Sequence, residues 1–114
     1  FLFFLFSNQI IRNIFMKKSY LTLVVHILVK EAYREEIKAE LLKLISPTRG
    51  EEGCIAYDLH QDNDNPNLFL FHEKWVNQEY LTKHSQSDHI AAYRIISKDK
   101  LENVTAYKMT ELTN

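Results

Sequence analysis

A hairpin in the middle of the chain limits the folds that this sequence can adopt. The segment from Ile55 to His60 alternates apolar and polar residues, which is the pattern of a strand with two unlike faces. Leu68 to Trp75 alternates in the same way, and the run from Asp62 to Asn67 between them is rich in residues that favour tight turns. One face of the second strand then carries Phe69, Phe71, Glu73 and Trp75. We therefore expect a pair of antiparallel strands that belongs to a larger sheet.

A strand and a helix precede the hairpin. Residues 20–29 read YLTLVVHILV, which is rich in β-branched and aliphatic residues and contains no turn former, so we expect a strand that is buried on both faces. His26 is the one polar ring inside it. Apolar residues then recur at helical spacing from Tyr33 to Ile45, which predicts an amphipathic helix that ends before Pro47.

Short helices and a last strand follow the hairpin. Asn77 has the chemistry of an N-cap for a helix that runs to His84, and Ser87 has it for a helix from Asp88 to Ile96. We expect residues 102–112 to form the last strand. The order strand, helix, strand, strand, broken helix, strand matches the ferredoxin-like α+β fold, in which helices cover one face of a four-stranded antiparallel sheet.

The sheet face without helices is expected to be apolar. We expect it to carry part of the last strand together with Leu23, Val25, Ile27 and Leu70. So large an exposed apolar surface is unusual for a monomer, and two-fold pairing is the commonest symmetry that covers one. The sequence therefore predicts a homodimer in which the sheets of two copies pack together.

Composition excludes several classes of function. A chain of 114 residues, 46% of them hydrophobic, can form one compact core. It has 14 basic and 15 acidic residues and no basic stripe interleaved with aromatic residues, so nucleic acid is not an expected partner. The single cysteine, Cys54, excludes an intrachain disulfide framework and a multi-cysteine zinc site, and we expect it to be a small core residue rather than a nucleophile. A reducing, cytoplasmic location is expected.

Residues 1–15 differ in character from the rest of the chain. They begin FLFFLF, are interrupted from Ser7 to Gln9, and are too short to span a bilayer, which takes about 20 apolar residues. No basic residue precedes the apolar run and no small-residue cleavage site follows it, so they also make a poor signal peptide. Because Met16 resembles an ordinary start of translation, we interpret residues 1–15 as an extension outside the fold and residues 16–114 as the domain. The alternative is a weak anchor at a membrane surface, without stable insertion.

Several short patterns occur in a fixed order along the chain. They are E-x-G-C from Glu51 to Cys54, D-x-x-x-P-x-x-F from Asp62 to Phe69, E-x-W from Glu73 to Trp75, and H-x-x-x-x-H from His84 to His89. In these patterns, and over about residues 20–112, the sequence resembles the antibiotic biosynthesis monooxygenase domain family. The resemblance is strongest to its small stand-alone members assigned as quinol monooxygenases and to its autoinducer-processing relatives.

The resemblance implies a dimeric α/β-barrel protein of the ferredoxin-like class whose pocket lies between sheet and helices. Some members oxygenate phenolic or quinol-like substrates with molecular oxygen and without metal, flavin or haem, whereas others isomerise sugar-derived ligands or degrade haem. The fold alone therefore does not decide the chemistry. Haem-degrading relatives need an axial histidine on the last helix, where this chain has Tyr93 and Arg94. Some oxygenases place an asparagine four residues before the tryptophan, where this chain has Phe71.

Oxygenation without a cofactor needs a general base in a dry pocket, because deprotonation gives the substrate the electron density that passes to oxygen. Histidine suits this task near neutral pH. His26, His84 and His89 are the candidates by position, and the resemblance implies that each falls where family members often have a pocket residue. The alternatives are a core histidine satisfied by a backbone carbonyl for His26, and a helix cap or an exposed side chain for the other two.

No metal site and no cofactor are expected. On a continuous helix His84 and His89 would point about 140° apart, which prevents them from binding one ion. A break between Ser85 and Ser87 would allow both to point inward.

Aromatic side chains and a carboxylate are expected to complete the pocket. Phe69, Phe71 and Trp75 share a strand face with Glu73 and suit the stacking of a flat ring. Glu73 would orient a histidine or accept a hydrogen bond from a substrate hydroxyl, or else form an ion pair with Arg94 or a lysine. We also expect contacts to the substrate from Trp75, Tyr57 and Tyr93. For each of them the alternative is a structural role in the packing of the core.

These features predict a cofactor-independent monooxygenase that oxidises a small aromatic, quinol-like compound with molecular oxygen, with His26 or His84 as the base. An isomerase of a small hydroxy-carbonyl compound would use the same histidines to move protons without oxygen. A non-enzymatic, dimeric ligand-binding or stress-response module is the third interpretation, in which the histidine and glutamate side chains satisfy one another.

Overall fold

A sheet of four antiparallel strands in the order β2-β3-β1-β4 forms the framework of the protein. The computed structural model describes residues 20–113. The strands are β1 (Leu21–Val29), β2 (Cys54–Gln61), β3 (Leu68–Trp75) and β4 (Leu101–Thr110). The helices are the 3-10 turn η1 (Glu31–Tyr33) and the α-helices α2 (Arg34–Lys43), α3 (Ile45–Arg49), α4 (Gln78–Ser85) and α5 (Asp88–Ser97).

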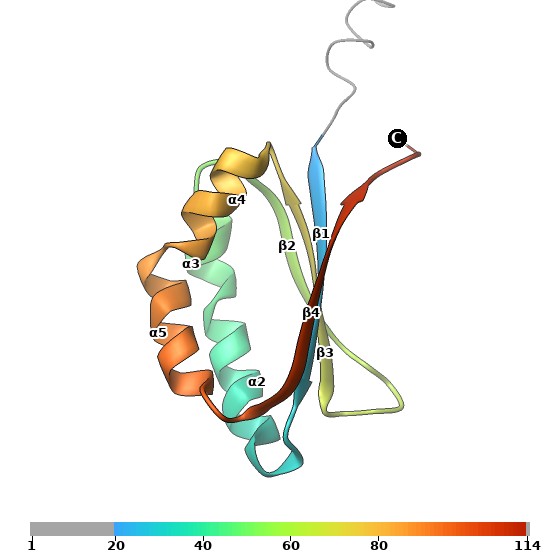
Figure 1. Ribbon diagram of the computed structural model, residues 1–114, viewed down its shortest axis with the longest axis vertical. Coiled ribbons are helices and arrows are strands. Elements are labelled where there is room, and N and C mark those ends of the chain that lie inside the picture. The colour runs from blue at the N-terminus through green and yellow to red at the C-terminus, as the bar shows by residue number, and fades with distance from the viewer. Residues whose placement is uncertain (1–19, 114) are drawn as a thin grey trace, which may run out of the picture.

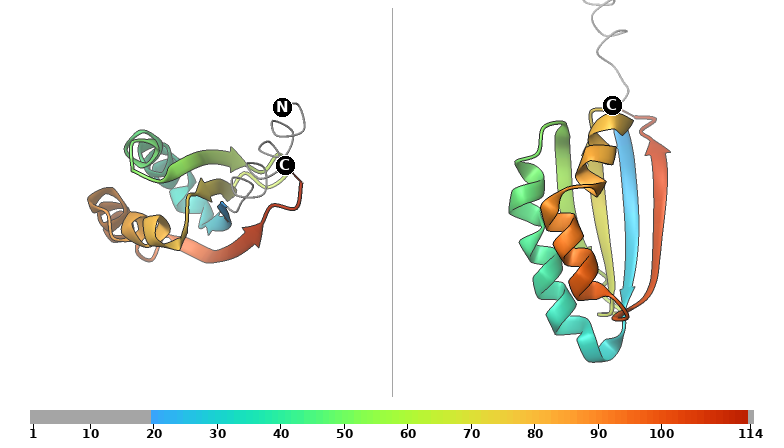
Figure 2. Two further views of the ribbon diagram at one scale, coloured as in Figure 1. Left: turned by 90° about the horizontal axis from the view of Figure 1, so that it is seen from above. Right: turned by 60° about the vertical axis from the view of Figure 1, so that its left-hand side comes forward.

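The helices lie on one face of the sheet, and no described helix covers the other, which we call the bare face (Figure 1, Figure 2). Strands β1 and β3 are central and β2 and β4 are at the edges, which is the arrangement of the ferredoxin-like fold, so the predicted fold class is confirmed. The expected boundary between residues 15 and 16 lies outside the described residues. Within residues 20–113, none of the helices is long and apolar enough to cross a membrane.

The register between β1 and β3 decides which side chains face the helices. Leu23 pairs with Glu73 and Ile27 pairs with Phe69, so the odd-numbered residues of both strands share the helix-covered face. His26 pairs with Leu70 and lies on the bare face. The expectation for the bare face was therefore wrong for Leu23, Val25 and Ile27. An uninterrupted apolar strand has no period that distinguishes one of its faces from the other.

The first helical segment continues past the residue at which the sequence predicted its end. Helix α2 ends at Lys43 and α3 begins at Ile45, so Pro47 lies in the first turn of α3 rather than after a helix. Proline is tolerated there because the first backbone N–H groups of a helix have no partner within it. Ile37 and Leu41, both fully buried, pack α2 into the core.

The turn before β2 requires a glycine. Gly53 has a φ of 85°, which lies in the left-handed region that other residues avoid. A β-carbon at this position would also clash with the ring of Tyr80 in α4. This close approach packs α4 against the turn that leads into β2.

We predict that Gly53→Ala lowers the free energy of unfolding by about 2 kcal/mol or more, because backbone strain and displacement of Tyr80 add. Gly50→Ala is the matched control, since Gly50 has a φ of −83° and the nearest atom to its β-carbon would be the backbone oxygen of Pro47 at 3.5 Å. The control should change stability by less than about 1 kcal/mol. Urea unfolding of both variants measures the difference, and equal stabilities would contradict the role assigned to Gly53.

Candidate active site

A cavity of about 230 Å³ lies between the helix-covered face of the sheet and the helices. Much of its wall is aliphatic and comes from β1, α2 and α5. The lining residues with polar groups are Tyr57, Glu73, His84, Ser85, Tyr93 and Arg94. An apolar hollow with a few polar groups is the usual form of a site for a small molecule.

Aromatic rings form the sheet side of the cavity. Tyr57 on β2 stacks on Phe71 on β3 with ring centroids 4.4 Å apart, and both line the cavity. Trp75 and Phe69 are 0% and 1% exposed and belong to the core, and neither lines the cavity. Of the three rings of the predicted aromatic wall, Phe71 therefore faces the hollow, whereas Phe69 and Trp75 lie in the core behind it.

Glu73 is an acidic side chain in this largely apolar wall. It is 3% exposed, and its Oε1 accepts a hydrogen bond from Nε1 of Trp75 at 2.9 Å. Burial raises the pKa of Glu73 to about 7, the hydrogen bond from Trp75 opposes the rise, and the charge of Glu51 adds to it. Within residues 20–113 Glu73 forms no ion pair with Arg94 or a lysine, and the Arg94 guanidinium instead donates to the backbone oxygen of Ser85 at 2.8 Å. Glu73 can therefore give or take a proton near neutral pH.

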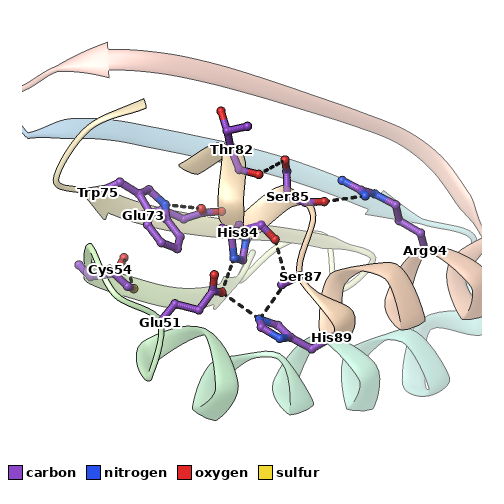
Figure 3. A network of polar contacts seen from close by, with 11 residues as sticks. Glu51, Cys54, Glu73, Trp75, Thr82, His84, Ser85, Ser87, His89 and Arg94 are labelled. Atoms are coloured by element: carbon purple, nitrogen blue, oxygen red, sulfur yellow. Dashed lines mark hydrogen bonds and ion pairs between the residues drawn. The ribbon is translucent and has the colours of Figure 1, made fainter. Parts of the chain in front are cut away.

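A carboxylate outside the cavity wall holds His84 in place (Figure 3). His84 lies near the end of α4, is 6% exposed, and its Nδ1 is 2.6 Å from Oε2 of Glu51. Its ring centroid lies 4.7 Å from that of Trp75 and 5.5 Å from that of Tyr57. An ionised carboxylate only accepts hydrogen bonds, so Nδ1 carries the ring proton and Nε2 keeps its lone pair. Within residues 20–113, no side chain or backbone group hydrogen-bonds Nε2.

Burial and the Glu51 carboxylate shift the pKa of His84 in opposite directions. Burial is the larger effect and lowers the pKa of His84, whereas the hydrogen bond and the charge of Glu51 raise it. The neutral ring that burial favours is the form that a general base requires.

His89 reaches the same carboxylate from the next helix. The predicted break between α4 and α5 is present. Ser87 stabilises it by donating from Oγ to the backbone oxygen of His84 at 2.7 Å, and its side chain does not cap α5. Nε2 of His89 then lies 2.9 Å from Oε2 of Glu51. His89 thus belongs to the polar network of Figure 3, but it does not line the cavity.

The sequence reasoning did not single out Glu51, although this residue organises the network. Glu51 lies in the turn between α3 and β2, and its side chain is 17% exposed. Periodicity cannot place a loop residue, so the only available signal was its position in the E-x-G-C pattern. The donor atoms of Glu51, His84 and His89 lie within 4.8 Å of one another, and these are the described residues that could hold a metal ion.

His26 lies on the bare face of the sheet, away from this network. It borders a second hollow of about 390 Å³ together with His60, and its ring packs edge-on against Tyr107 with centroids 5.8 Å apart. The expected convergence of His26 with Glu73 and His84 on one hollow is therefore not found. The register of β1 is the physical reason, because it turns even-numbered side chains away from the helices.

The remaining candidates divide between cavity and core. Tyr93 on α5 lines the cavity, and burial raises the pKa of its phenol. Burial also raises the pKa of Cys54, to about 11, with the charges of nearby carboxylates adding to the rise. A thiol that stays protonated is a poor nucleophile, which agrees with the interpretation of Cys54 as a structural residue.

Comparison with known proteins finds relatives over most of the chain. A family model described as antibiotic biosynthesis monooxygenase matches residues 20–94. YcnE of Bacillus subtilis, provisionally named a monooxygenase, is 30% identical over 93 residues, which are 82% of this chain and 98% of YcnE. Rv0793 of Mycobacterium tuberculosis, named in the same way, is 39% identical over 61 residues, which are 54% of this chain and 59% of Rv0793. The uncharacterised protein sll1783 of Synechocystis is 35% identical over 89 residues, so that 75% of this chain matches 60% of that protein.

Solved structures share the same fold. The crystal structure of PA3566 from Pseudomonas aeruginosa matches with a TM-score of 0.81 at 31% identity and covers 84% of this chain and 97% of its own. The structure of Rv0793 matches with a TM-score of 0.78 at 26% identity, over 84% of this chain and 98% of that one. The arrangement of sheet and helices is thus common to these proteins.

The burial of Glu73 predicts that stability depends on pH. Its pKa rises from an ordinary 4.5 to about 7 in the folded chain, so its contribution to stability is fully present below pH 4.5 and is lost as the pH rises through 7. Glu73→Gln keeps an acceptor for Trp75 but does not titrate. Between pH 4.5 and 8, the variant should therefore gain on the order of 2 to 3 kcal/mol in unfolding free energy relative to wild type. Urea unfolding of both proteins across this range tests the prediction, and a difference that does not vary with pH would contradict it.

Proposed function

This chain belongs to the antibiotic biosynthesis monooxygenase family, and we propose that it oxidises a small aromatic, quinol-like compound with molecular oxygen in the cavity beside His84. The observation that carries the proposal is an imidazole on the cavity wall whose Nδ1 is held by the Glu51 carboxylate at 2.6 Å. The monooxygenase names of YcnE and Rv0793 support the class of reaction.

The cavity wall suits a flat and uncharged ring. The stacked pair of Tyr57 and Phe71 offers aromatic surface, and Leu23, Val25 and Ile27 add aliphatic surface beside it. A volume of about 230 Å³ limits the substrate to a small molecule. An apolar wall also favours a neutral phenol over an anion until the proton is removed inside the cavity.

The proposed reaction needs no external reductant, because the substrate supplies the electrons. Nε2 of His84 accepts the proton of a phenolic hydroxyl, and the phenolate passes electrons to molecular oxygen, which bonds to a ring carbon that carries a hydrogen and lies ortho or para to the phenolate oxygen. The O–O bond of this peroxide then breaks. One oxygen atom stays on the ring as a quinone carbonyl, and the other leaves as water with the hydrogen of that ring carbon and the proton held by His84. A phenol and molecular oxygen thus give a quinone and water.

Glu73 is proposed to assist the step in which the O–O bond breaks. It lines the same cavity, and with a pKa raised to about 7 it is partly protonated at neutral pH. A neutral carboxylic acid can donate a hydrogen bond to the departing peroxide oxygen, which stabilises the charge that develops there. Glu73 would then act as the acid and His84 as the base.

An isomerase is the second candidate, because Glu73 and His84 on one cavity could also move a proton between the carbon and oxygen atoms of a hydroxy-carbonyl compound. That reaction consumes no oxygen. The aliphatic and aromatic wall favours the first candidate, since a sugar-derived compound would leave several hydroxyl groups without partners.

We also propose that the protein is a homodimer that pairs through the bare face. Tyr107 and Met109 on β4 are 47% and 46% exposed, and the register places them on that face next to Val24 and Thr22 of β1. Leu70 of β3 belongs to the same face. A second copy presents the same surface, so a two-fold axis would bury these apolar side chains in both copies at once.

We expect metal-free protein to consume oxygen with members of a panel of hydroquinones and anthrones. His84→Ala should lower kcat by about 100-fold or more, because it removes the proposed base. His26→Ala is the matched control, since this histidine lies on the other face of the sheet, and it should retain the rate. An oxygen electrode and the absorbance of the quinone product measure both quantities.

Two results would overturn this mechanism. One is uptake that survives His84→Ala, and the other is the absence of uptake with every compound of the panel. Formation of an isomer from a hydroxy-carbonyl compound under anaerobic conditions would instead select the second candidate.

The dimer is tested by placing a charge on the bare face. Tyr107→Asp should shift the sedimentation mass from dimer to monomer, because an aspartate in the paired interface would lose its hydration without gaining a partner. Ile95→Asp is the matched control, since Ile95 on α5 is 78% exposed and lies on the helix side. Analytical ultracentrifugation measures both variants. A monomeric wild type, or the same mass for the two variants, would exclude pairing through this face.

A further inference from the structure

Glu51, His84 and His89 bring donor atoms from three separate segments to one point. Oε2 of Glu51 lies 2.6 Å from Nδ1 of His84 and 2.9 Å from Nε2 of His89. All the donor atoms lie within 4.8 Å of one another, where the loop before β2, helix α4 and helix α5 meet (Figure 3). The break between the helices makes this possible, because on one continuous helix the histidines would diverge.

We propose that these side chains form a binding site for one divalent transition-metal ion. Imidazole nitrogen and carboxylate oxygen are ligands that Zn²⁺ and Co²⁺ accept. Ligand atoms around a tetrahedral ion lie about 3.4 Å apart when each is about 2.1 Å from the metal. The separations of 2.6 and 2.9 Å therefore need to lengthen by less than about 1 Å, and the two histidine nitrogens, which lie within 4.8 Å of each other, need to approach by about 1.4 Å at most. Small rotations of the side chains supply such a change without moving the backbone.

The surroundings of the cluster favour an ion. The side chains of Glu51, His84 and His89 are 17%, 8% and 22% exposed, so solvent screens the attraction between carboxylate and metal only weakly. The protein ligands leave at least one coordination position open, as in catalytic zinc sites. Oγ of Ser87, which lies 3.3 Å from Nε2 of His89, places a hydroxyl group beside the cluster.

A bound ion and the base role of His84 exclude each other. In the hydrogen-bonded arrangement Nδ1 carries the ring proton, and Nε2 offers a lone pair. An ion on Nδ1 needs the lone pair at that atom, so the ring proton moves to Nε2. His84 then presents a donor where the reaction needs an acceptor, and the ion inhibits. This consequence rests on the proposed function, whereas the binding of the ion does not.

Trp75 provides a direct readout of binding. It is the only tryptophan of the chain, and its ring centroid is 4.7 Å from that of His84. Titration of untagged, chelator-treated protein with Co²⁺ should quench its fluorescence to saturation at one ion per chain. Glu51→Gln and His89→Ala should each weaken binding by about tenfold or more. His72→Ala is the matched control, because this histidine pairs with Val24 on the bare face, and it should bind as wild type does.

Metal binding and inhibition by the metal are tested by separate outcomes. Absence of saturable quenching at millimolar Co²⁺, or equal affinity of wild type and Glu51→Gln, would overturn the site, and circular dichroism checks that each variant is folded. In the oxygen assay Zn²⁺ should lower the rate of wild type and of His72→Ala at the same concentration, and about tenfold more Zn²⁺ should be needed for the same inhibition of His89→Ala. If Zn²⁺ binds without changing the wild-type rate, the inhibition is overturned. If no compound supports oxygen uptake, the proposed function fails while the binding result stands.

Discussion

The register between β1 and β3 is the constraint on which the candidate site depends. It buries the odd-numbered side chains of both strands beneath the helices, and a slip by one residue would exchange Glu73 for His72 on that face. Such a slip would also expose Phe69 and Trp75, which are at most 1% exposed, so the hydrophobic effect fixes the register strongly. The same burial surrounds Glu73 with apolar groups and raises its pKa to about 7. The packing of the core thereby sets the chemistry of the cavity.

Glu51 lies in the loop before β2 and contacts histidines on helices α4 and α5, so it links the sheet to both helices beside the cavity. A partly buried carboxylate is costly unless hydrogen-bonded, and here His84 and His89 both approach the same oxygen, at 2.6 and 2.9 Å. Gly53, two residues further along, allows the sharp turn that packs this loop beneath Tyr80 of α4. Removal of the carboxylate would therefore loosen two helices and free the His84 ring, so the stability of this corner and its chemistry are coupled.

Local patterns in the sequence predicted most of the fold. The predictions failed where a segment has no periodic pattern that places its side chains. Alternation and turn residues predicted β3 with its observed bounds, Leu68–Trp75, and the predicted cap at Asn77 is confirmed, since its Oδ1 accepts from the backbone nitrogen of Tyr80 at 3.2 Å. The apolar run of β1 could not tell which face the helices cover, so His26 was assigned to the wrong side of the sheet. Glu51 lies in a turn, where contacts distant in sequence decide the position of a side chain. For His84 and His89 the sequence left two arrangements open, divergence on a continuous helix or approach across a break, and the structure has the break.

Burial shifts the pKa values of Glu73 and His84 in opposite directions, and both shifts reduce the charge on the cavity wall. It raises the pKa of the carboxyl and lowers that of the imidazole, so each is pushed toward its neutral form. An acid and a base can then lie on one apolar cavity without the desolvation cost of an ion pair. In the proposed reaction, the proton that His84 accepts would place a positive charge on the ring that Glu51 contacts at 2.6 Å. Glu51 would then compensate the charge of the imidazolium from outside the cavity wall.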